Sequence, residues 1–159
     1  RLFDETDEVF GGAIELFRAR LADPLAKIFR DERWGRVIVF TEFGGPRSFA
    51  GLHEPGDAMR LTLFDVNPHK QGILGPATFL KTFGKHDLDT PAFLGVHRWS
   101  RGFVERVCRG ELEGVTEEGV VGKAGDGHKL IMAKAKTQVW IDKVIAQYGV
   151  ERGQKLVNS

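Results

Sequence analysis

The sequence predicts an α+β fold in which antiparallel sheets are flanked by helices. Two runs rich in β-branched and aromatic residues end at turn-forming residues, and a glycine-bearing turn separates two further extended runs. Helices and strands do not alternate as in a βαβ series, which argues against a doubly wound parallel sheet. With 159 residues, 42% of them apolar and 28% charged, the chain is expected to form a single globular domain over residues 1–159.

Two helices are expected at the start of the chain. Apolar residues recur at helical spacing within residues 13–22: Ile14, Phe17 and Leu21. Asp23 and Pro24 indicate a cap and a first-turn proline that open a second helix through Phe29. We therefore expect the two helices to bend at Pro24.

Two strands are expected next. Residues 36–43 form a β-branched and aromatic run that ends at a Gly-Gly-Pro turn, residues 44–46. Residues 58–66 form the second strand, which ends before Asn67 and Pro68. The polar, glycine-bearing residues 47–57 connect the two strands.

The middle of the chain contains two expected helices. Residues 77–83 form the first, and residues 87–95 are irregular until a brief extended piece at 93–96. Ser100 is placed to cap a helix that runs through Arg109 and ends at Gly110.

The last part of the chain predicts a hairpin followed by a helix. Residues 118–124 and 129–136 are extended runs separated by a Gly-Asp-Gly turn, residues 125–127. Residues 138–148 are helical with a stop at Gly149, so residues 138–159 are expected to be a C-terminal helix and tail.

Charge and composition limit the classes of partner. The net charge of +1 means that any phosphate-binding surface must be local. No stretch approaches the roughly 18 apolar residues of a membrane span, and the first residues lack the apolar region of a signal peptide. Because the single cysteine, Cys108, cannot form an internal disulfide, these features together predict a cytoplasmic protein without a membrane partner.

The first candidate site residue is a carboxylate at the end of a strand. Alternation along residues 36–43 places Ile38, Phe40 and Glu42 on one face. A carboxylate that continues an apolar row costs several kcal/mol unless it is paired, hydrogen-bonded or placed at the mouth of a pocket. The alternative is that Glu42 lies in water at the end of the strand.

The second group of candidates lies on the expected hairpin. Lys134 and Lys136 share one face, where two ammonium groups repel each other unless an anion lies between them. Glu118 lies on the face of Val120, and simple alternation places Lys123 on the opposite face. Pairing of the strands lets Glu118 share a surface with the two lysines, and Mg²⁺ would reconcile a carboxylate with a phosphate. This predicts a nucleotide or polyphosphate site, and an ordinary salt-bridged sheet surface is the alternative.

Four segments in order resemble the covalent nucleotidyltransferase superfamily, most closely its ATP-dependent RNA ligases. Residues 39–45 (VFTEFGG) resemble motif III, and residues 63–66 (LFDV) are similar to motif IIIa. Residues 118–123 (EGVVGK) resemble motif IV, and residues 134–136 (KAK) resemble motif V. The resemblance implies the adenylation-domain fold of ligases, built from antiparallel sheets.

The resemblance also implies roles for the candidate residues. Glu42 would bind the ribose hydroxyl of the nucleotide, and Phe64 would stack on the adenine. Glu118 would hold a divalent metal, Mg²⁺ or Mn²⁺, while the paired lysines of motif V neutralise the phosphates of ATP: Lys134 and Lys136. Lys123 aligns with the lysine of motif IV and would belong to the nucleotide site.

The implied activity joins RNA ends in three steps. A lysine attacks ATP to give lysyl-AMP, the AMP passes to a 5′-phosphate, and a 3′-hydroxyl then displaces it. The expected partner is therefore RNA with 5′-phosphate and 3′-hydroxyl ends. Negative charge develops on phosphoryl oxygens at each step, which paired lysines and a divalent metal stabilise.

One motif of the superfamily has no counterpart in the sequence. Motif I, Lys-x-Asp-Gly, supplies the nucleophilic lysine, and no such tetrapeptide precedes Glu42. We expect the chain to be a partial adenylyltransferase domain whose nucleophile lies before Arg1, and that the chain by itself does not form lysyl-AMP. The alternatives are a noncatalytic nucleotide-binding or RNA-binding module of the same fold and a fragment of a DNA ligase adenylation domain.

Other residues have two interpretations. His53 either lines the nucleotide cleft or lies in a solvated loop, and Trp140 serves packing rather than base stacking. Four arginines in or near one helix either follow a nucleic-acid backbone or form a solvated face: Arg98, Arg101, Arg106 and Arg109.

Overall fold

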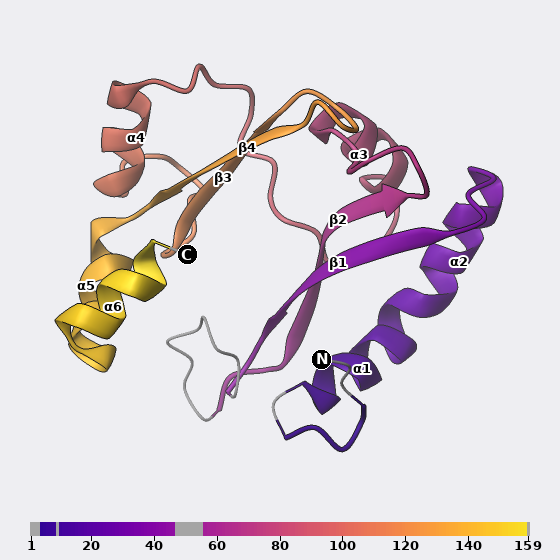
Figure 1. The fold of residues 1–159 in the computed structure, drawn as a ribbon, viewed down its shortest axis with the longest axis horizontal. Helices are drawn as coiled ribbons and strands as arrows, with labels where there is room; N and C mark the ends of the chain where they lie inside the picture. Colours follow the sequence, from indigo (N-terminus) through magenta and orange to yellow (C-terminus); the bar gives the residue numbers. More distant parts are fainter. Residues whose placement is uncertain (1–3, 9, 47–55, 159) are drawn as a thin grey trace. The chain divides into compact units, whose positions relative to one another are not determined.

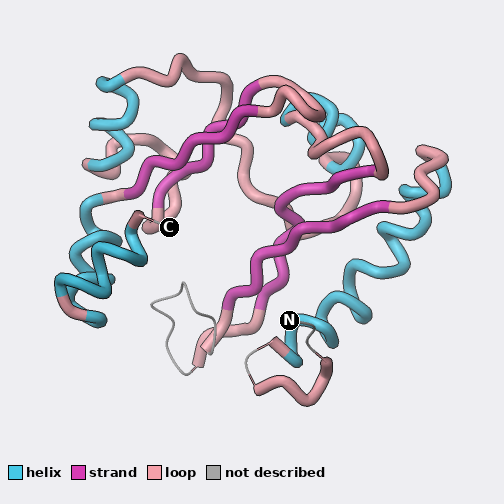
Figure 2. Tube along the Cα trace, viewed as in Figure 1, coloured by secondary structure: helices cyan, strands magenta, loops and turns pink. Residues whose placement is uncertain are grey.

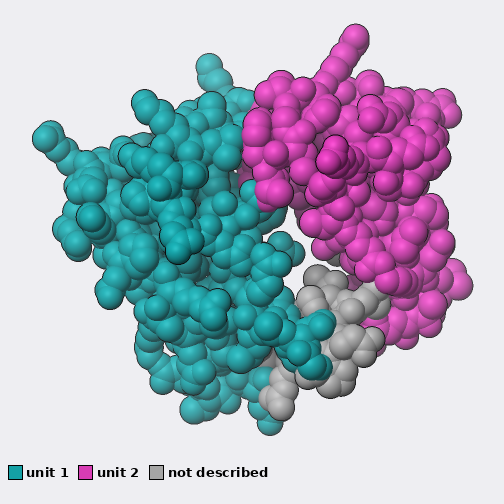
Figure 3. Space-filling model, turned by 180° about the vertical axis from the view of Figure 1, so that it is seen from behind, with its two compact units in different colours: residues 1–91, 125–130 teal, residues 92–124, 131–159 magenta. Residues whose placement is uncertain are grey.

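The computed structural model describes residues 4–8, 10–46 and 56–158 of the chain (Figure 1). It is a mixed α+β structure with two separate two-stranded antiparallel sheets (Figure 2). The chain divides into two compact units, which Figure 3 colours separately. Unit 1 consists of residues 1–91 and 125–130, and unit 2 of residues 92–124 and 131–159.

Unit 1 begins with a helical segment that continues through Pro24. Helix α1 (Gly11–Leu16) passes through the π-helical turn η1 (Phe17–Leu21) into α2 (Ala22–Asp31). The predicted cap at Asp23 is wrong, because Leu21 is the N-cap residue of α2 and makes no side-chain cap bond. Proline lacks the N–H of a regular helix and crowds the carbonyl one turn earlier, and the wider π turn lies at that position.

Strands β1 (Val37–Gly44) and β2 (Arg60–Pro68) form the sheet of unit 1, close to the predicted ranges. Their antiparallel register shifts by one residue, since Phe40 pairs with Asp65 and Thr41 pairs with Leu63. Phe64 is therefore the extra residue of a β-bulge, which the sequence pattern did not predict.

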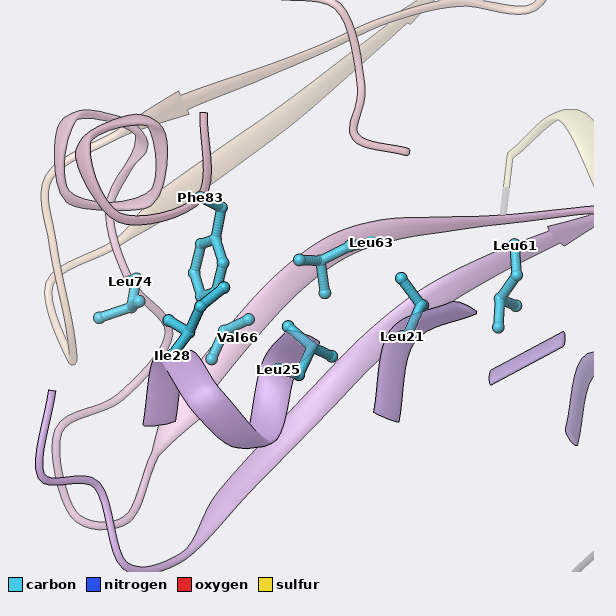
Figure 4. Close-up of a cluster of buried hydrophobic side chains, with 8 residues drawn as sticks. All are labelled: Leu21, Leu25, Ile28, Leu61, Leu63, Val66, Leu74 and Phe83. Atoms are coloured by element: carbon cyan, nitrogen blue, oxygen red, sulfur yellow. The ribbon is translucent and has the colours of Figure 1, made fainter. Parts of the chain in front are cut away.

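The core of unit 1 lies between the helices and one face of this sheet (Figure 4). Leu63 and Val66 are both fully buried although they are three residues apart. Simple alternation would place them on opposite faces, and the bulge at Phe64 brings them to the same face. Buried residues of the helices, of β2 and of the following segment complete the cluster: Leu21, Leu25, Ile28, Leu61, Leu74 and Phe83.

The predicted apolar row of β1 does not face this core. Val37, Val39 and Phe43 pack against the buried cluster, whereas Ile38 and Phe40 are 56% and 40% exposed. The alternation along the strand is as expected. The residues of β1 that face the core therefore belong to the row that does not contain Glu42.

Helix α3 (Pro76–Phe83) of unit 1 is joined to the tip of the hairpin formed by residues 125–130. Ile73 and Gly127 form a β-bridge. A Cβ atom on Gly72, whose φ is +78°, would lie 2.5 Å from the carbonyl carbon of Gly127. Only glycine at position 72 permits this close approach of two backbones.

Asp126, at this tip, caps helix α3 from a distant part of the chain. Its carboxylate accepts hydrogen bonds from the Gly75 N–H at 2.6 Å and the Thr78 hydroxyl at 2.9 Å. These bonds, that of Gly75 first, hold the pKa of Asp126 below its ordinary value. A negative charge at a helix N-terminus is favourable because the first N–H groups of a helix have no partner within it.

We expect Asp126→Asn to lower the urea midpoint of unfolding at neutral pH. In the wild type, the ionised Asp126 carboxylate contributes fully to stability above the ordinary aspartate pKa of about 3.9. This stability is lost as the pH falls through the lower pKa of the folded state. The midpoints of the two proteins should therefore converge on acidification from pH 7 to pH 2. A constant difference over that range would contradict the assignment.

Unit 2 combines a short helix, the second sheet and a helical hairpin. Helix α4 (Arg101–Cys108) begins at the predicted cap, since the Ser100 hydroxyl accepts from the Phe103 N–H at 3.3 Å. Residues 93–96, predicted to be extended, join no sheet.

The remaining elements of unit 2 follow in order: β3 (Gly119–Ala124), β4 (Ile131–Lys136), α5 (Gln138–Tyr148) and α6 (Val150–Val157). Helix α5 ends at Gly149 as predicted, where φ is +76°. The predicted tail instead contains α6, which packs on α5 where Gly153 meets Ile145. Among the described helices, none combines the length and the apolar character that crossing a lipid bilayer requires.

Candidate functional site

Three of the predicted site residues share one face of the β3–β4 sheet. Gly119 pairs with Lys136, Val121 with Lys134, and Lys123 with Met132. Directly paired residues of an antiparallel sheet lie on the same face, and alternate residues of a strand return to it. Lys123, Lys134 and Lys136 therefore lie on a single face, which we call the lysine face.

The opposite face of this sheet is covered by the segment that leads into α4. A Cβ atom on Gly122 would lie 2.6 Å from the ring of Trp99, so this ring lies directly on Gly122. Gly122 pairs with Ala133 on the face that carries no lysine. Phe103 of α4 packs on Trp99, with ring centroids 5.4 Å apart. Small residues on this face allow the aromatic rings to approach the backbone.

Glu118 reaches the lysine face although strict alternation predicts the other face. Its carboxylate lies 3.4 Å from the ammonium of Lys136. The strand begins only at Gly119, whose φ of +137° belongs to the region that favours glycine. A Cβ atom there would collide with the carbonyl oxygen of Ala135. Simple alternation therefore holds within β3 but not across Gly119. This irregularity explains why Glu118 and Lys123 lie on the same face of the sheet.

The two lysines of β4 have different surroundings. The side chain of Lys136 is only 14% exposed. Its ammonium contacts the Glu118 carboxylate and lies 4.0 Å from the centroid of the Trp140 ring. Lys134 is exposed. Lys136 is therefore held in place before any ligand binds, whereas Lys134 extends into solvent.

A buried threonine joins the two groups that contact Lys136. The Thr137 hydroxyl accepts a hydrogen bond from the backbone N–H of Trp140 at 3.2 Å and donates one to the carbonyl oxygen of Glu117. The Thr137 N–H donates to the carbonyl oxygen of Glu118 at 3.0 Å. Thr137 thus caps helix α5 and ties the first turn of that helix to the start of β3.

The other two predicted site residues lie in unit 1. Glu42 is exposed near the end of β1 and pairs with Thr62, on the face that carries Ile38 and Phe40. Phe64 is half-buried at the bulge of β2. The structure brings Glu118, Lys123, Lys134 and Lys136 together on one sheet, and Glu42 and Phe64 lie on the other sheet.

The donor set at Glu118 suits a magnesium ion that is bound together with phosphate. Mg²⁺ in nucleotide sites is held by one or two carboxylates, by substrate phosphates and by water. Within the described part of the chain, no group of three or more histidine, cysteine, aspartate or glutamate residues is placed to hold a metal. Glu118 could supply one carboxylate ligand to such an ion, and a bound phosphate would have to supply others.

Two of the arginines in and next to α4 form ion pairs with acidic residues. Arg101 contacts Glu105 at 2.8 Å, and Arg109 contacts Glu111 at 2.6 Å. Hydrogen bonding to Arg109 lowers the pKa of the Glu111 carboxyl. These pairs reduce the charge available to a nucleic-acid backbone. His53 lies outside the described residues.

Trp140 is the residue of this site that the sequence pattern assigned to packing alone. It is 6% exposed, as a packing residue would be, but its ring also contacts the ammonium of Lys136. Lys136 ends a strand and Trp140 lies in the following helix. Neither the strand pattern nor the helix pattern of the sequence therefore predicts their contact. The only available signal was the Thr137 cap, which fixes where α5 starts.

Comparison with protein-family models, with curated proteins and with solved structures finds no match to this chain.

Proposed function

We propose that this chain carries the nucleotide-binding strands of an ATP-dependent nucleotidyltransferase of the RNA ligase type, and that its lysine face binds the phosphates of ATP. The observation that carries the proposal is the register of β3 and β4, which places Lys123, Lys134 and Lys136 on one face with Glu118 at its end. The residues directly opposite these lysines in the register are Met132, Val121 and Gly119, and Glu118 forms an ion pair with Lys136.

The electrostatics of the lysine face favour a polyphosphate. Like charges on neighbouring positions of a sheet are destabilising in the free protein, and a ligand with several negative charges relieves this repulsion. Lys136 is partly neutralised by Glu118, and the exposed Lys134 adds a second cation to the same face. Charge-assisted hydrogen bonds from lysine to phosphate oxygens would then supply much of the binding free energy.

The resemblance assigns ribose binding to Glu42 and adenine stacking to Phe64, and the chemistry of the two side chains suits these roles. An ionised Glu42 accepts hydrogen bonds only, which suits the hydroxyl groups of a ribose. The ring of Phe64 offers an apolar surface for an adenine, and the stacking of a base on an aromatic ring is worth about 1–3 kcal/mol. The exposure of Glu42 at the end of β1 supports this assignment.

The reaction that follows from the resemblance transfers AMP. A lysine amine attacks the α-phosphorus of ATP, the bond from that phosphorus to the bridging oxygen breaks, and pyrophosphate leaves. AMP then passes to the 5′-phosphate of an RNA, and a 3′-hydroxyl displaces it to seal the strand. In these steps the lysine face would stabilise the charge that develops on phosphoryl oxygens. We assign the nucleophilic lysine to no position of this chain.

A second candidate is a binding module that takes up ATP or RNA ends without catalysis. One observation favours it, because none of the lysines in the chain is followed by x-Asp-Gly. Because neither candidate places the nucleophile in this chain, the separating test incubates a longer protein, one that contains this chain together with a Lys-x-Asp-Gly motif, with ATP labelled at the α-phosphate. Covalent label on the protein requires a nucleophile, whereas bound but unreacted ATP supports the binding module.

The role of Glu118 gives the test of the proposed site. We expect Mg²⁺ to raise the affinity of the wild type for ATP by about tenfold, which corresponds to 1.4 kcal/mol. Glu118→Gln should abolish this rise, because the metal loses its carboxylate ligand. It should not weaken the metal-free binding of tripolyphosphate, because the variant also removes the charge that partly neutralises Lys136. Isothermal titration calorimetry with and without Mg²⁺ measures both quantities.

The neighbouring carboxylate provides a matched control. Glu117 pairs with Lys143 rather than with a lysine of β4. Glu117→Gln changes the net charge equally and should leave the effect of Mg²⁺ unchanged. Equal losses in the two variants, or a wild type that binds neither ATP nor tripolyphosphate, would refute the proposed function.

A further inference from the structure

We infer that Trp140 is a positioning residue, whose ring holds the ammonium of Lys136 on the lysine face so that phosphate meets a charge already in place. This inference rests on the proposed function, because it assigns a role in phosphate binding at the same site. The ammonium lies 4.0 Å from the centroid of the ring, well within the range of a cation–π interaction.

The chemistry of the ring explains why it suits this role better than a second carboxylate. The face of an indole attracts a cation through its quadrupole and carries no net charge. A second carboxylate would cancel the positive charge of Lys136 and repel an approaching phosphate. The ring therefore holds the cation and leaves its charge available to the ligand.

Holding the lysine in advance lowers the entropic cost of binding. Ordering a free lysine side chain on binding costs entropy, because the side chain loses many rotamers. In this structure much of that cost is met when the protein folds, because the Lys136 side chain is 14% exposed and contacts both Glu118 and Trp140. Ligands bind more tightly to groups that are already ordered.

The position of the ring is itself constrained. The Trp140 side chain is packed, since the residue is only 6% exposed, and its backbone N–H donates a hydrogen bond to the hydroxyl of the buried Thr137. Thr137 also forms hydrogen bonds to the backbone carbonyls of Glu117 and Glu118. The backbone positions that carry the Trp140 ring and the Glu118 carboxylate are therefore linked through Thr137. Burial of the ring, together with the cap that fixes the start of α5, therefore keeps the ring against Lys136.

The test replaces Trp140 by tryptophans with increasing numbers of fluorine atoms, introduced at this position only. Fluorine weakens the quadrupole of the ring and nearly preserves its volume, so a packing role alone would be little affected. We expect the affinity for tripolyphosphate to fall in step with fluorination, by about three- to tenfold over the series, since cation–π interactions span roughly this range. The melting temperature of each variant checks that the fold is retained.

Two controls assign the effect to Lys136. The same fluorinated residues at Trp99, which lies on the opposite face against Gly122, should leave the affinity unchanged. In a Lys136→Met background, fluorination of Trp140 should also have no effect, because the cation is absent. This double-mutant cycle isolates the contact between the two side chains.

A second readout follows the lysine without any ligand. The ring of Trp140 should shift the NMR signals of the Lys136 ε-methylene upfield, and Trp140→Leu should abolish that shift. If the wild type binds tripolyphosphate and the fluorinated series is flat, the inference is wrong and the proposed function stands. If the wild type shows the ring shift but binds neither tripolyphosphate nor ATP, the proposed function fails and the phosphate-positioning role fails with it.

Discussion

Replacement of Lys134 and Lys136 together by alanine is expected to weaken the binding of tripolyphosphate and ATP by at least about 100-fold. Each hydrogen bond to a charged group contributes roughly 1.5–3 kcal/mol, so the loss of two such groups amounts to about two or more powers of ten in affinity. Both side chains lie on the lysine face, two residues apart on β4. Calorimetric titration of the double variant measures the loss.

The single variants should differ in a way that reflects their surroundings. Lys134→Ala removes an exposed cation and should alter affinity alone. Lys136→Ala also leaves the Glu118 carboxylate without the ammonium at 3.4 Å and removes the cation from the Trp140 ring. We therefore expect Lys136→Ala to lower the melting temperature as well as the affinity.

A double substitution elsewhere controls for the change in net charge. Lys81 lies on α3, and Lys155 lies on α6, where it pairs with Glu151. Lys81→Ala with Lys155→Ala removes the same two charges, and it should leave phosphate affinity within about twofold because neither lysine belongs to the β3–β4 sheet. Equal losses in the two double variants would indicate a general charge effect and would remove the support for a phosphate site.

Leu63→Ala is expected to lower the free energy of unfolding by about 3–4 kcal/mol, the middle of the range for truncation of a fully buried leucine. Leu63 has no exposed surface and lies in the core cluster between α2 and the sheet. The surrounding side chains come from several elements, so they can close the resulting cavity only in part. Urea denaturation followed by circular dichroism measures the change.

A neighbouring residue tests whether the bulge sets the face. Thr62 is half-buried and pairs with Glu42 on the opposite side of the sheet. Thr62→Ala should therefore cost less than about 1 kcal/mol, as is usual for substitutions outside the core. A larger loss in Thr62→Ala than in Leu63→Ala would mean that the register of β1 and β2 differs from the one described.

Several elements were predictable because local chemistry determines them. The helix from Arg101 begins at a serine that caps it, and α5 ends at a glycine with positive φ. The alternation along β1 correctly separated Val37 and Val39 from Ile38 and Phe40. Caps, turns and strand periodicity depend on a few adjacent residues, so a single sequence contains the information.

The irregular positions were not predictable in the same way. The bulge at Phe64 inserts one residue into a strand whose composition looks regular, and the turn of the backbone at Gly119 redirects Glu118. Each changes the face on which neighbouring side chains lie. A one-residue irregularity has almost no compositional signal, because it depends on what the paired strand and the packed helix require.

Contacts between distant segments were also beyond the sequence. Asp126 looks like an ordinary turn residue, but its carboxylate caps α3 about fifty positions earlier in the chain, at Gly75 and Thr78. Trp140 looks like a core residue of a helix stripe, but its ring contacts Lys136. In both cases the residue type allows several partners, and only the folded chain selects one.

The sequence by itself determined the α+β class, the order of the main elements and the chemical types of the candidate site residues. These follow from periodicity, capping and charge, which act over a few residues. Only the tertiary structure decided that Lys123, Lys134 and Lys136 share a face, that Glu118 reaches it, and that Trp140 holds one of the lysines. Those facts depend on strand register and on one glycine conformation, which are selected by the packing of the whole unit rather than by any local pattern.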